Sequence, residues 1–236
     1  MAITARQTPR AKAEPVAEGK YRLNLKAAHQ RYRLKDGTIV PGVTTVLGIL
    51  DKPALLNWAW RCGQEGIDIH KVKESAADVG TVCHARCEAW LRGLEFDSYN
   101  VSPEQMELSE IGLLRFQDWW TAQELKLHSC EVQMVSETFR VGGMADIVGI
   151  RPNGDCVLID IKTSNGIYLE HRIQVAAYAA MWAETRLLVE PDEVLIVRLG
   201  KKESEEIEIA PVKKRPELVQ VFGHLAQAYH ALKLVR

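Results

Sequence analysis

The fold is decided by two neighbouring stretches of the sequence, VGGMAD at residues 141–146 and DCVLIDIKTS at residues 155–164. Each has the apolar pattern and the length of a β-strand, so together they predict two consecutive strands. On the second strand, Asp160 and Lys162 lie on one face because side chains alternate along a strand. Asp146 closes the first stretch. Two carboxylates and a lysine are therefore expected in or beside adjacent strands, and charged residues at the end of an otherwise apolar strand need a specific reason.

Around these stretches, hydrophobic spacing predicts three strands, a helix and a further strand, in that order. The strands are expected at residues 130–135, 139–150 and 156–161, the helix at 168–188 and the last strand at 193–199. Because a helical crossover joins the last two strands, we expect them to be parallel and connected right-handedly. The sequence thus predicts an α/β fold in which a central mixed β-sheet is flanked by helices.

Further elements are predicted on both sides of this core. Upstream, short strands are expected at residues 21–25, 30–34 and 38–40, with a hairpin turn at Asp36-Gly37. Two short helices are expected within 44–63, and further helices at 78–91 and from an N-cap at Ser102 to about 125. Downstream, a C-terminal helix presents one apolar face, made of Leu218, Phe222, Leu225, Tyr229 and Leu232. We expect a mobile basic arm over residues 1–19 and a single domain over residues 20–236.

The composition is that of a globular protein: of 236 residues, 47% are hydrophobic and 26% charged, enough for one sizeable core. The longest apolar run, residues 175–183, is too short to cross a membrane as a helix. Five scattered cysteines and no signal-peptide core indicate reduced thiols in a cytosol-like compartment. Residues 1–35 carry nine Lys or Arg against two Glu, a net +7, so the remaining chain carries −8. This basic segment either contacts phosphates or is a solvated tail.

The two carboxylates have a functional and a structural interpretation. Asp146 and Asp160 can hold Mg²⁺ or Mn²⁺, hard cations that prefer oxygen ligands, with Lys162 beside a metal-bound water. The alternative is an ion pair at a strand end, because an Asp-x-Lys triplet arises by chance about once in a chain of this length. Gln174 and Tyr178 lie on one face of the following helix, where they can orient the lysine or contact a nucleotide; the border of an amphipathic helix is the alternative.

Other candidate ligands come from upstream segments. His84 and Glu88 are one helical turn apart, and either can add a metal ligand, although a helical histidine is often a hydrogen-bonded structural residue. Glu131, on a strand beside the expected site, fits a solvated position as well as a catalytic one. Cys83 and Cys87 flank His84, but a fourth ligand at suitable spacing for zinc is missing, which favours buried small residues.

Four motifs in chain order resemble the RecB-type branch of the PD-(D/E)xK nuclease superfamily. They are Gly80-Thr81-x-x-His84, Gly143-x-x-Asp146, Asp160-x-Lys162 and Gln174-x-x-x-Tyr178. Upstream, GVTTVL at residues 42–47, followed by KPAL at 52–55 and Trp58, is similar to phage exonucleases and to the mitochondrial genome maintenance exonuclease. The resemblance covers about residues 43–199. The sequence departs from the superfamily pattern at Ala145, where a proline would precede the aspartate.

The resemblance implies a restriction-endonuclease-like core and a role for each matching residue. The implied metal ligands are His84, Asp146, Asp160 and the backbone carbonyl of Ile161, and Lys162 would orient or activate water. Gln174 and Tyr178 would contact DNA and brace the active centre. The expected DNA-binding set also includes Thr163, Ser164, Arg31 and Arg33, while Glu88 and Glu131 are secondary candidates for the site.

The implied activity is that of a Mg²⁺-dependent DNA exonuclease in recombination, repair or replication, with Mn²⁺ able to substitute. No iron–sulfur cluster is expected, because no cysteine follows Cys156. The alternatives are an endonuclease of the same family, a non-catalytic DNA-end binding or recombination partner that keeps the fold, and an interaction module with a structural Asp–Lys pair.

The resemblance also suggests partners and a compartment. DNA ends, single- or double-stranded, are the expected substrate, and a single-strand annealing or recombination protein and a second copy of the chain are candidate partners. We expect no membrane association. The expected compartment is the cytoplasm of a bacterium or of a phage-infected host, rather than the mitochondrion.

Overall fold

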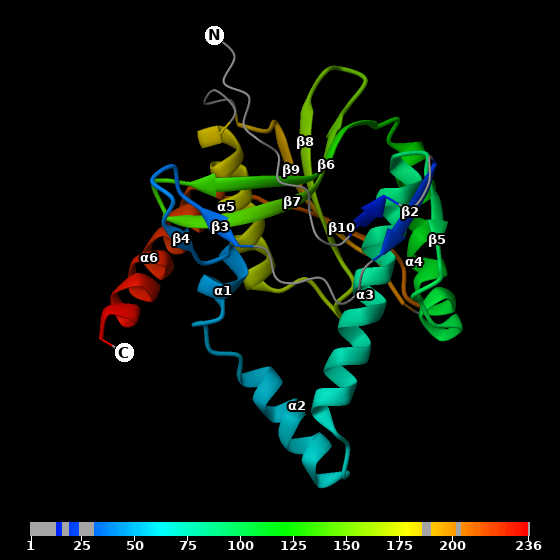
Figure 1. Ribbon diagram of the computed structural model, residues 1–236, viewed down its shortest axis with the longest axis horizontal. Helices are drawn as coiled ribbons and strands as arrows, with labels where there is room; N and C mark the ends of the chain where they lie inside the picture. Colours follow the sequence, from blue (N-terminus) through cyan, green and yellow to red (C-terminus); the bar gives the residue numbers. More distant parts are fainter. Residues whose placement is uncertain (1–12, 16–18, 24–30, 186–189, 202–203, 236) are drawn as a thin grey trace.

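A central sheet of five strands runs through the computed structural model in the order β10-β9-β8-β7-β6 (Figure 1). β8 and β9 are parallel, and the other neighbouring strands are antiparallel. The strands span Lys126–Ser136 (β6), Val141–Ile150 (β7), Cys156–Lys162 (β8), Glu193–Arg198 (β9) and Glu208–Pro211 (β10). The predicted mixed sheet is confirmed. The structure describes residues 13–15, 19–23, 31–185, 190–201 and 204–235.

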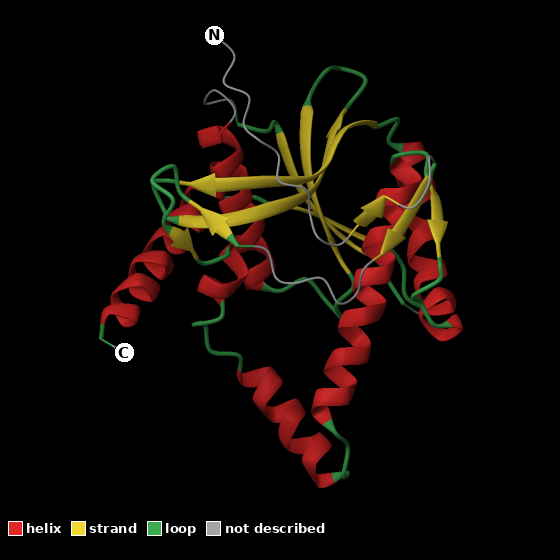
Figure 2. Ribbon diagram, in the orientation of Figure 1, coloured by secondary structure: helices red, strands yellow, loops and turns green. Residues whose placement is uncertain are grey.

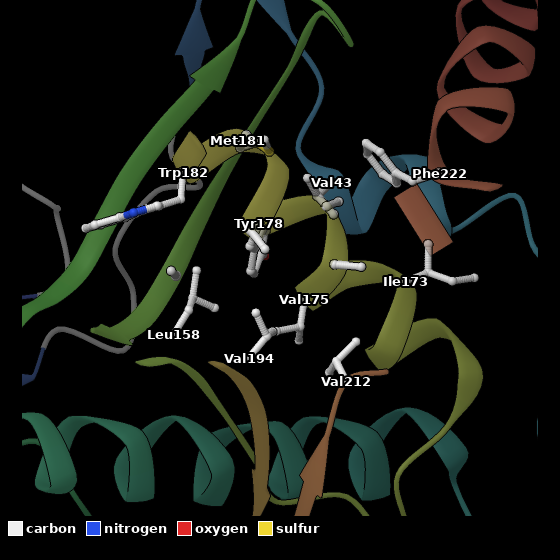
Figure 3. Close-up of a cluster of buried hydrophobic side chains, with 14 of the residues drawn as sticks. Val43, Leu158, Ile173, Val175, Tyr178, Met181, Trp182, Val194, Val212 and Phe222 are labelled. Carbon is white, nitrogen blue, oxygen red and sulfur yellow. The ribbon is translucent and has the colours of Figure 1, made fainter. Parts of the chain in front are cut away.

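Helices cover both faces of this sheet (Figure 2). α5 (Leu169–Thr185), α6 (Arg215–Leu234) and α1 (Val43–Leu47) enclose one apolar cluster against the sheet. Figure 3 shows side chains of this cluster converging from α5, the sheet strands and α6. α3 (Ile69–Leu91) and α4 (Pro103–Ala122) enclose a second cluster on the opposite face. The layered helix–sheet–helix arrangement buries both faces of the central strands.

The alternation along β8 determines where its charged residues lie. Leu158 belongs to the cluster under α5, whereas Ile159 and Ile161 belong to the cluster under α4. Because side chains alternate along a strand, Asp160 and Lys162 face the α5 side. The predicted common face of Asp160 and Lys162 is confirmed.

Two predicted elements of the sheet differ in extent. The crossover helix α5 ends at Thr185, and residues 186–189 of the predicted helix lie outside the described residues. β10 was not predicted, because EIAP has neither a sustained apolar run nor a strand-favouring composition. Pairing with β9 makes it a strand: Glu208 lies opposite Arg198, and their side chains form an ion pair of 2.8 Å.

The hairpin predicted around Asp36-Gly37 is confirmed, whereas the strand predicted before it at residues 21–25 belongs to another sheet. β3 (Tyr32–Arg33) and β4 (Ile39–Val40) pair as a hairpin, but β2 (Lys20–Leu23) joins a separate sheet with β1 (Ala13–Pro15) and β5 (Glu95–Asp97). β1 lies within the segment expected to be a mobile arm; the rest of residues 1–18, and residues 24–30, lie outside the described residues.

Long-range contacts give β2 its partner. Arg22 pairs with Asp97 of β5 at 2.6 Å, and Tyr21 and Leu23 are buried against α3. None of these contacts is visible in local hydrophobic spacing, so the partner of β2 could not be predicted from it.

Capping residues and a first-turn proline mark the starts of the helices upstream of the core. α2 spans Pro53–Gln64 with Pro53 in its first turn, and α4 begins with the predicted capping box, in which Ser102 accepts the Gln105 N–H at 3.2 Å. α3 begins at Ile69, nine residues before the predicted start, because Asp68 caps it by accepting the N–H groups of His70 and Lys71. α2 and the first turns of α3 extend away from the sheet (Figure 1). No helix in the described part of the chain combines the length and apolarity needed to cross a membrane.

The predicted apolar face of α6 is buried along most of its length. Phe222 is fully buried, and Leu218, Leu225 and Tyr229 pack against the same cluster. Leu232 is 44% exposed, contrary to expectation, because the last turn of the helix extends beyond the packed cluster.

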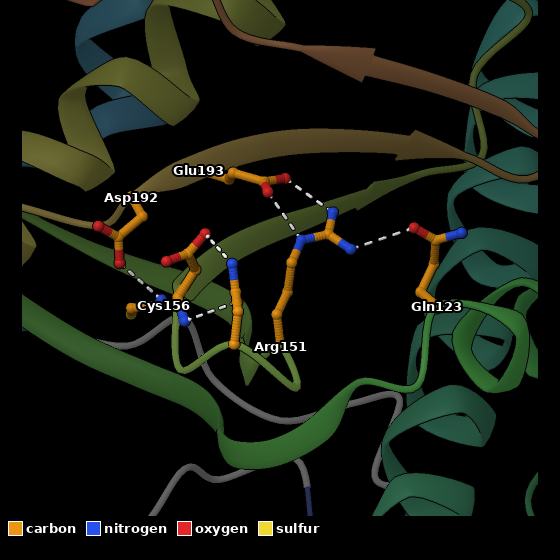
Figure 4. A network of polar contacts seen from close by, with 7 residues as sticks. Gln123, Arg151, Cys156, Asp192 and Glu193 are labelled. Carbon is orange, nitrogen blue, oxygen red and sulfur yellow. Dashed lines mark hydrogen bonds and ion pairs between the residues drawn. The ribbon is translucent and has the colours of Figure 1, made fainter.

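A polar network joins the starts of β8 and β9, at the end of β8 that lies away from Asp160 and Lys162 (Figure 4). The Arg151 guanidinium donates two hydrogen bonds of 2.7 Å to Glu193 at the start of β9 and one of 3.2 Å to Gln123 after α4. Asp192 accepts the backbone N–H of Cys156 at 2.7 Å. The start of β8 is thereby tied to the residue before β9, and the turn after β7 is tied to the start of β9 and to the end of α4.

Candidate active site

Asp146 lies where two strands of the sheet separate. β7 pairs with β8 over Ile147–Ile150 only, and Asp146 is the first residue beyond this pairing. Its Oδ2 accepts the backbone N–H of Ile161 at 2.9 Å, so the side chain takes the place of a strand-to-strand hydrogen bond. The carboxylate is thereby held against the last residues of β8.

Asp160 and Lys162 form an ion pair on the face of β8 that looks toward α5. Asp160 is 1% exposed, and its Oδ2 is the atom that pairs with the Lys162 ammonium. Burial raises the pKa of Asp160 to about 6; Lys162 and His84 oppose this increase, and the charge of Asp146 adds to it. Asp160, Asp146, His84 and Lys162 therefore interact electrostatically as one group.

His84 reaches this group from α3, with its Nδ1 3.5 Å from Asp146 Oδ2. α3 approaches the end of β8 closely at Gly80, where a Cβ atom would lie 2.7 Å from Thr163 Oγ1. A glycine one turn before His84 thus lets the helix come near enough to bring the imidazole to the carboxylates.

Gln174 and Tyr178 lie together on the inner face of α5. Gln174 Nε2 donates a hydrogen bond of 2.9 Å to the Tyr178 hydroxyl, and burial raises the pKa of Tyr178 above its ordinary value. Tyr178 lies against Gly143 of β7, where a Cβ would approach its ring to 2.6 Å, while Tyr32 covers Gly142. Two adjacent glycines therefore leave room for an aromatic ring at each position.

The remaining predicted residues fall into two groups. Thr163 lies at the end of β8 against Gly80, and Ser164 donates to the Gly166 carbonyl at 2.7 Å, so both lie directly after Lys162. Arg31 and Arg33 are exposed in the β3–β4 region, where Arg33 donates to the Gly37 carbonyl at 3.0 Å. The arginines therefore belong to the hairpin whose Tyr32 packs on β7, rather than to the carboxylate group.

The two secondary candidates differ in position. Glu88 is 5% exposed and already engaged, since the Tyr21 hydroxyl donates to its Oε2 at 2.7 Å and Arg92 pairs with its Oε1 at 2.6 Å. These contacts give Glu88 a structural role beneath the site. Glu131 lies between the paired positions Cys130–Ile147 and Val132–Ala145 of β6 and β7, with a left-handed backbone (φ 53°) that marks a local irregularity of β6.

Residues of the types that bind metal ions are present, but their side chains do not form a complete coordination site. Among the described residues, no group of three or more His, Cys, Asp or Glu side chains is arranged to hold a metal ion. Cys83 and Cys87 are buried in the cluster under α4, as expected for small apolar residues, and burial raises the pKa of Cys87 well above its ordinary value. The acidic pair with its histidine remains the donor set best suited to a hard cation.

One residue of the site was missed from the sequence. His171, in the first turn of α5, is close enough to Lys162 for that charge to lower its pKa. Its spacing of three residues from Gln174 places both side chains on one helix face, which is the signal that could have identified it.

The model of the "PD-(D/E)XK nuclease superfamily" matches residues 56–234. This match covers about three quarters of the chain and includes α3, β7, β8 and α5, which carry the site. The chain belongs to this superfamily. The protein is thus a nuclease, with DNA as the substrate that the superfamily implies and divalent metal ions as its general cofactors.

Two solved structures are similar to this nuclease at low sequence identity. The crystal structure of SSO0001 is 16% identical with a TM-score of 0.36, covering 66% of this chain and 74% of its own. A "Putative exonuclease" from Eubacterium rectale is 12% identical with a TM-score of 0.44, covering 66% of each chain. No curated protein matches the chain.

Proposed function

We propose that this nuclease is a metal-dependent DNA exonuclease that hydrolyses phosphodiester bonds with a metal-activated water. The observation that carries the proposal is the meeting of Asp146, Asp160, Lys162 and His84, which come from three separate elements. The preference for exonuclease over endonuclease rests on the similarity of residues 42–47, residues 52–55 and Trp58 to phage exonucleases.

The donor set fits Mg²⁺, with Mn²⁺ as a substitute. Burial and the negative charge of Asp146 raise the pKa of Asp160, so a cation would relieve the repulsion between the two carboxylates. Asp146 and Asp160 would hold the ion, with His84 and the Ile161 carbonyl as further ligands. When bound, such an ion lowers the pKa of a coordinated water and neutralises charge on the phosphate.

The side chains around the carboxylates supply the rest of the chemistry. The Lys162 ammonium, 16% exposed, would stabilise the negative charge that develops on the phosphate during in-line attack or assist deprotonation of the water. Gln174 holds the Tyr178 hydroxyl, and this pair would brace β7, against which Tyr178 packs. Hydrolysis would leave a 5′-phosphate and a 3′-hydroxyl.

A cleavage assay with a lysine control tests the proposal. Linear single- and double-stranded DNA, labelled at the 5′ end, and closed circular DNA are incubated with Mg²⁺, Mn²⁺ or EDTA. We expect wild-type protein with metal to degrade linear DNA and the cleavage rate of Lys162→Ala to be at least 100-fold lower. Lys126→Ala, at an exposed lysine, should keep the wild-type cleavage rate.

Each other outcome favours a named alternative. Cleavage of circles would identify an endonuclease of the same superfamily. Binding of DNA without cleavage by the wild type would favour a non-catalytic DNA-end binding partner.

The proposal also includes DNA guidance, partners and a compartment. Arg31, Arg33 and the basic arm would guide the DNA strand. A single-strand annealing or recombination protein and a second copy of the chain are the proposed partners, and the proposed compartment is the cytoplasm.

A further inference from the structure

His171 extends the polar face of α5 toward the end of β8. It lies three residues before Gln174 and seven before Tyr178, so the three side chains follow one helix face. Its Nδ1 accepts the backbone N–H of Tyr168 at 3.3 Å. Because the lone pair of Nδ1 is used in this way, the ring proton of the neutral imidazole lies on Nε2, which becomes a hydrogen-bond donor. Nε2 has no partner among the described residues.

The charges around His171 keep it neutral. Burial and the positive charges of Lys162 and Lys52 lower the pKa of His171 to about 4, and Glu170 opposes them only in part. Glu170 is itself paired with Lys52 at 2.9 Å. At neutral pH, therefore, His171 presents an N–H donor without a charge of its own, beside an ammonium that attracts anions.

Tyr168 lies next to this donor and is available for stacking. Its ring meets the His171 ring edge to face, with the centroids 5.3 Å apart, and the residue is 47% exposed. Exposed aromatic side chains beside a phosphate-binding group are a common means of holding an unpaired base, since every base offers a π-face.

We propose that His171 and Tyr168 form a subsite for an unpaired nucleotide adjacent to the scissile phosphate. The Nε2–H of His171 donates to a non-bridging phosphate oxygen, and the Tyr168 ring stacks on the base. The subsite rests on the proposed nuclease function, because it requires a nucleic-acid strand at Lys162. It makes single-stranded DNA, or a frayed end, the form that this face of the site binds.

Two substitutions at one position separate substrate binding from a structural role. His171→Asn keeps an acceptor for the Tyr168 N–H but has no group that reaches the position of Nε2. His171→Gln places an N–H donor close to that position. The matched control is His128→Asn, an exposed histidine on β6.

Binding is measured in EDTA by fluorescence anisotropy with a labelled 20-nucleotide single-stranded DNA. We expect the Kd to rise about fivefold to tenfold for His171→Asn, and at least fivefold for Tyr168→Ala, but less than twofold for His171→Gln and His128→Asn. In a series of oligonucleotides with one methylphosphonate each, one position should weaken wild-type binding and leave His171→Asn unaffected.

Several results would overturn the subsite. These are wild-type affinity in His171→Asn, equal losses in the Asn and Gln variants, or no measurable binding of the probe by the wild type. The parallel cleavage assay keeps the two proposals apart. Wild-type cleavage without this binding pattern removes the subsite alone, whereas the binding pattern without cleavage removes the exonuclease proposal alone.

Discussion

Asp160 carries a charge in a position where burial opposes it. Burial and Asp146 raise its pKa from 3.8 to about 6, so the folded protein holds this proton between pH 4 and 6 while the unfolded chain loses it. Stability therefore falls as the pH rises through this window, and the loss is complete above about pH 6. A buried carboxylate that costs stability is typical of a functional site rather than a structural ion pair.

Asp160→Asn should consequently stabilise the metal-free protein at neutral pH. The gain over wild type is expected to be near zero at pH 4 and to reach about 2 kcal/mol at pH 7. Urea unfolding at pH values from 4 to 8 in EDTA measures it, with the exposed Asp118→Asn as control. A gain that does not change with pH would contradict the raised pKa.

Gly143 is required by the ring of Tyr178 rather than by backbone conformation. An added Cβ would lie 2.6 Å from the ring and 3.3 Å from Val43, so both neighbours would have to move. Gly143→Ala should cost about 2 kcal/mol of stability, because small-to-large changes in a packed interior force displacements.

A double-mutant cycle checks the Gly143 prediction. Tyr178→Leu should recover part of the loss in the Gly143→Ala background, and Gly63→Ala, where an added Cβ meets nothing within 4 Å, should not destabilise the protein. Strictly additive effects of Gly143→Ala and Tyr178→Leu would show that the ring is not the obstacle.

The helices that cover the sheet depend on local start signals. In α4 the Ser102 hydroxyl and the Gln105 side chain satisfy one backbone N–H each at the helix start. Ser102→Ala should lower the free energy of unfolding by about 1 kcal/mol, and Ser102→Asp should restore most of it, as measured by urea unfolding. Equal stability of the Ala and Asp variants would exclude a contribution from the cap.

A metal ion at the proposed centre would link three elements of the molecule, since its donors come from α3, β7 and β8. An ion that binds only this folded arrangement stabilises the whole domain, by about 2.7 kcal/mol at a concentration 100 times its Kd. For a chain of this size the melting temperature should rise by several degrees on addition of Mg²⁺ and return with EDTA.

Differential scanning fluorimetry of the wild type and of Asp146→Asn measures this effect. The variant should show little or no increase. An equal increase in both proteins would place the ion elsewhere, and no increase in the wild type would contradict the metal site.

Elements that depend on neighbours in the sequence were predicted well. Residues two apart on β8 share a face whatever surrounds them, so the common face of Asp160 and Lys162 followed from alternation alone. The Ser102 capping box and the division between α1 and α2 near Pro53 are equally local. In contrast, β10 is a strand only because it pairs with β9, and β2 pairs with β5 across 75 residues of chain. The early start of α3 depends on a cap before residues without an apolar face.

The sequence predicts which types of side chain form the site, because their motifs are short and ordered. These are two carboxylates, a lysine and a histidine. Their meeting is a tertiary property. Asp146 reaches Ile161 only because β7 separates from β8, and His84 reaches Asp146, 62 residues away in the chain, only because α3 passes close to Thr163 at Gly80. The raised pKa of Asp160 has the same origin, since burial and nearby charge exist only after helices have closed both faces of the sheet.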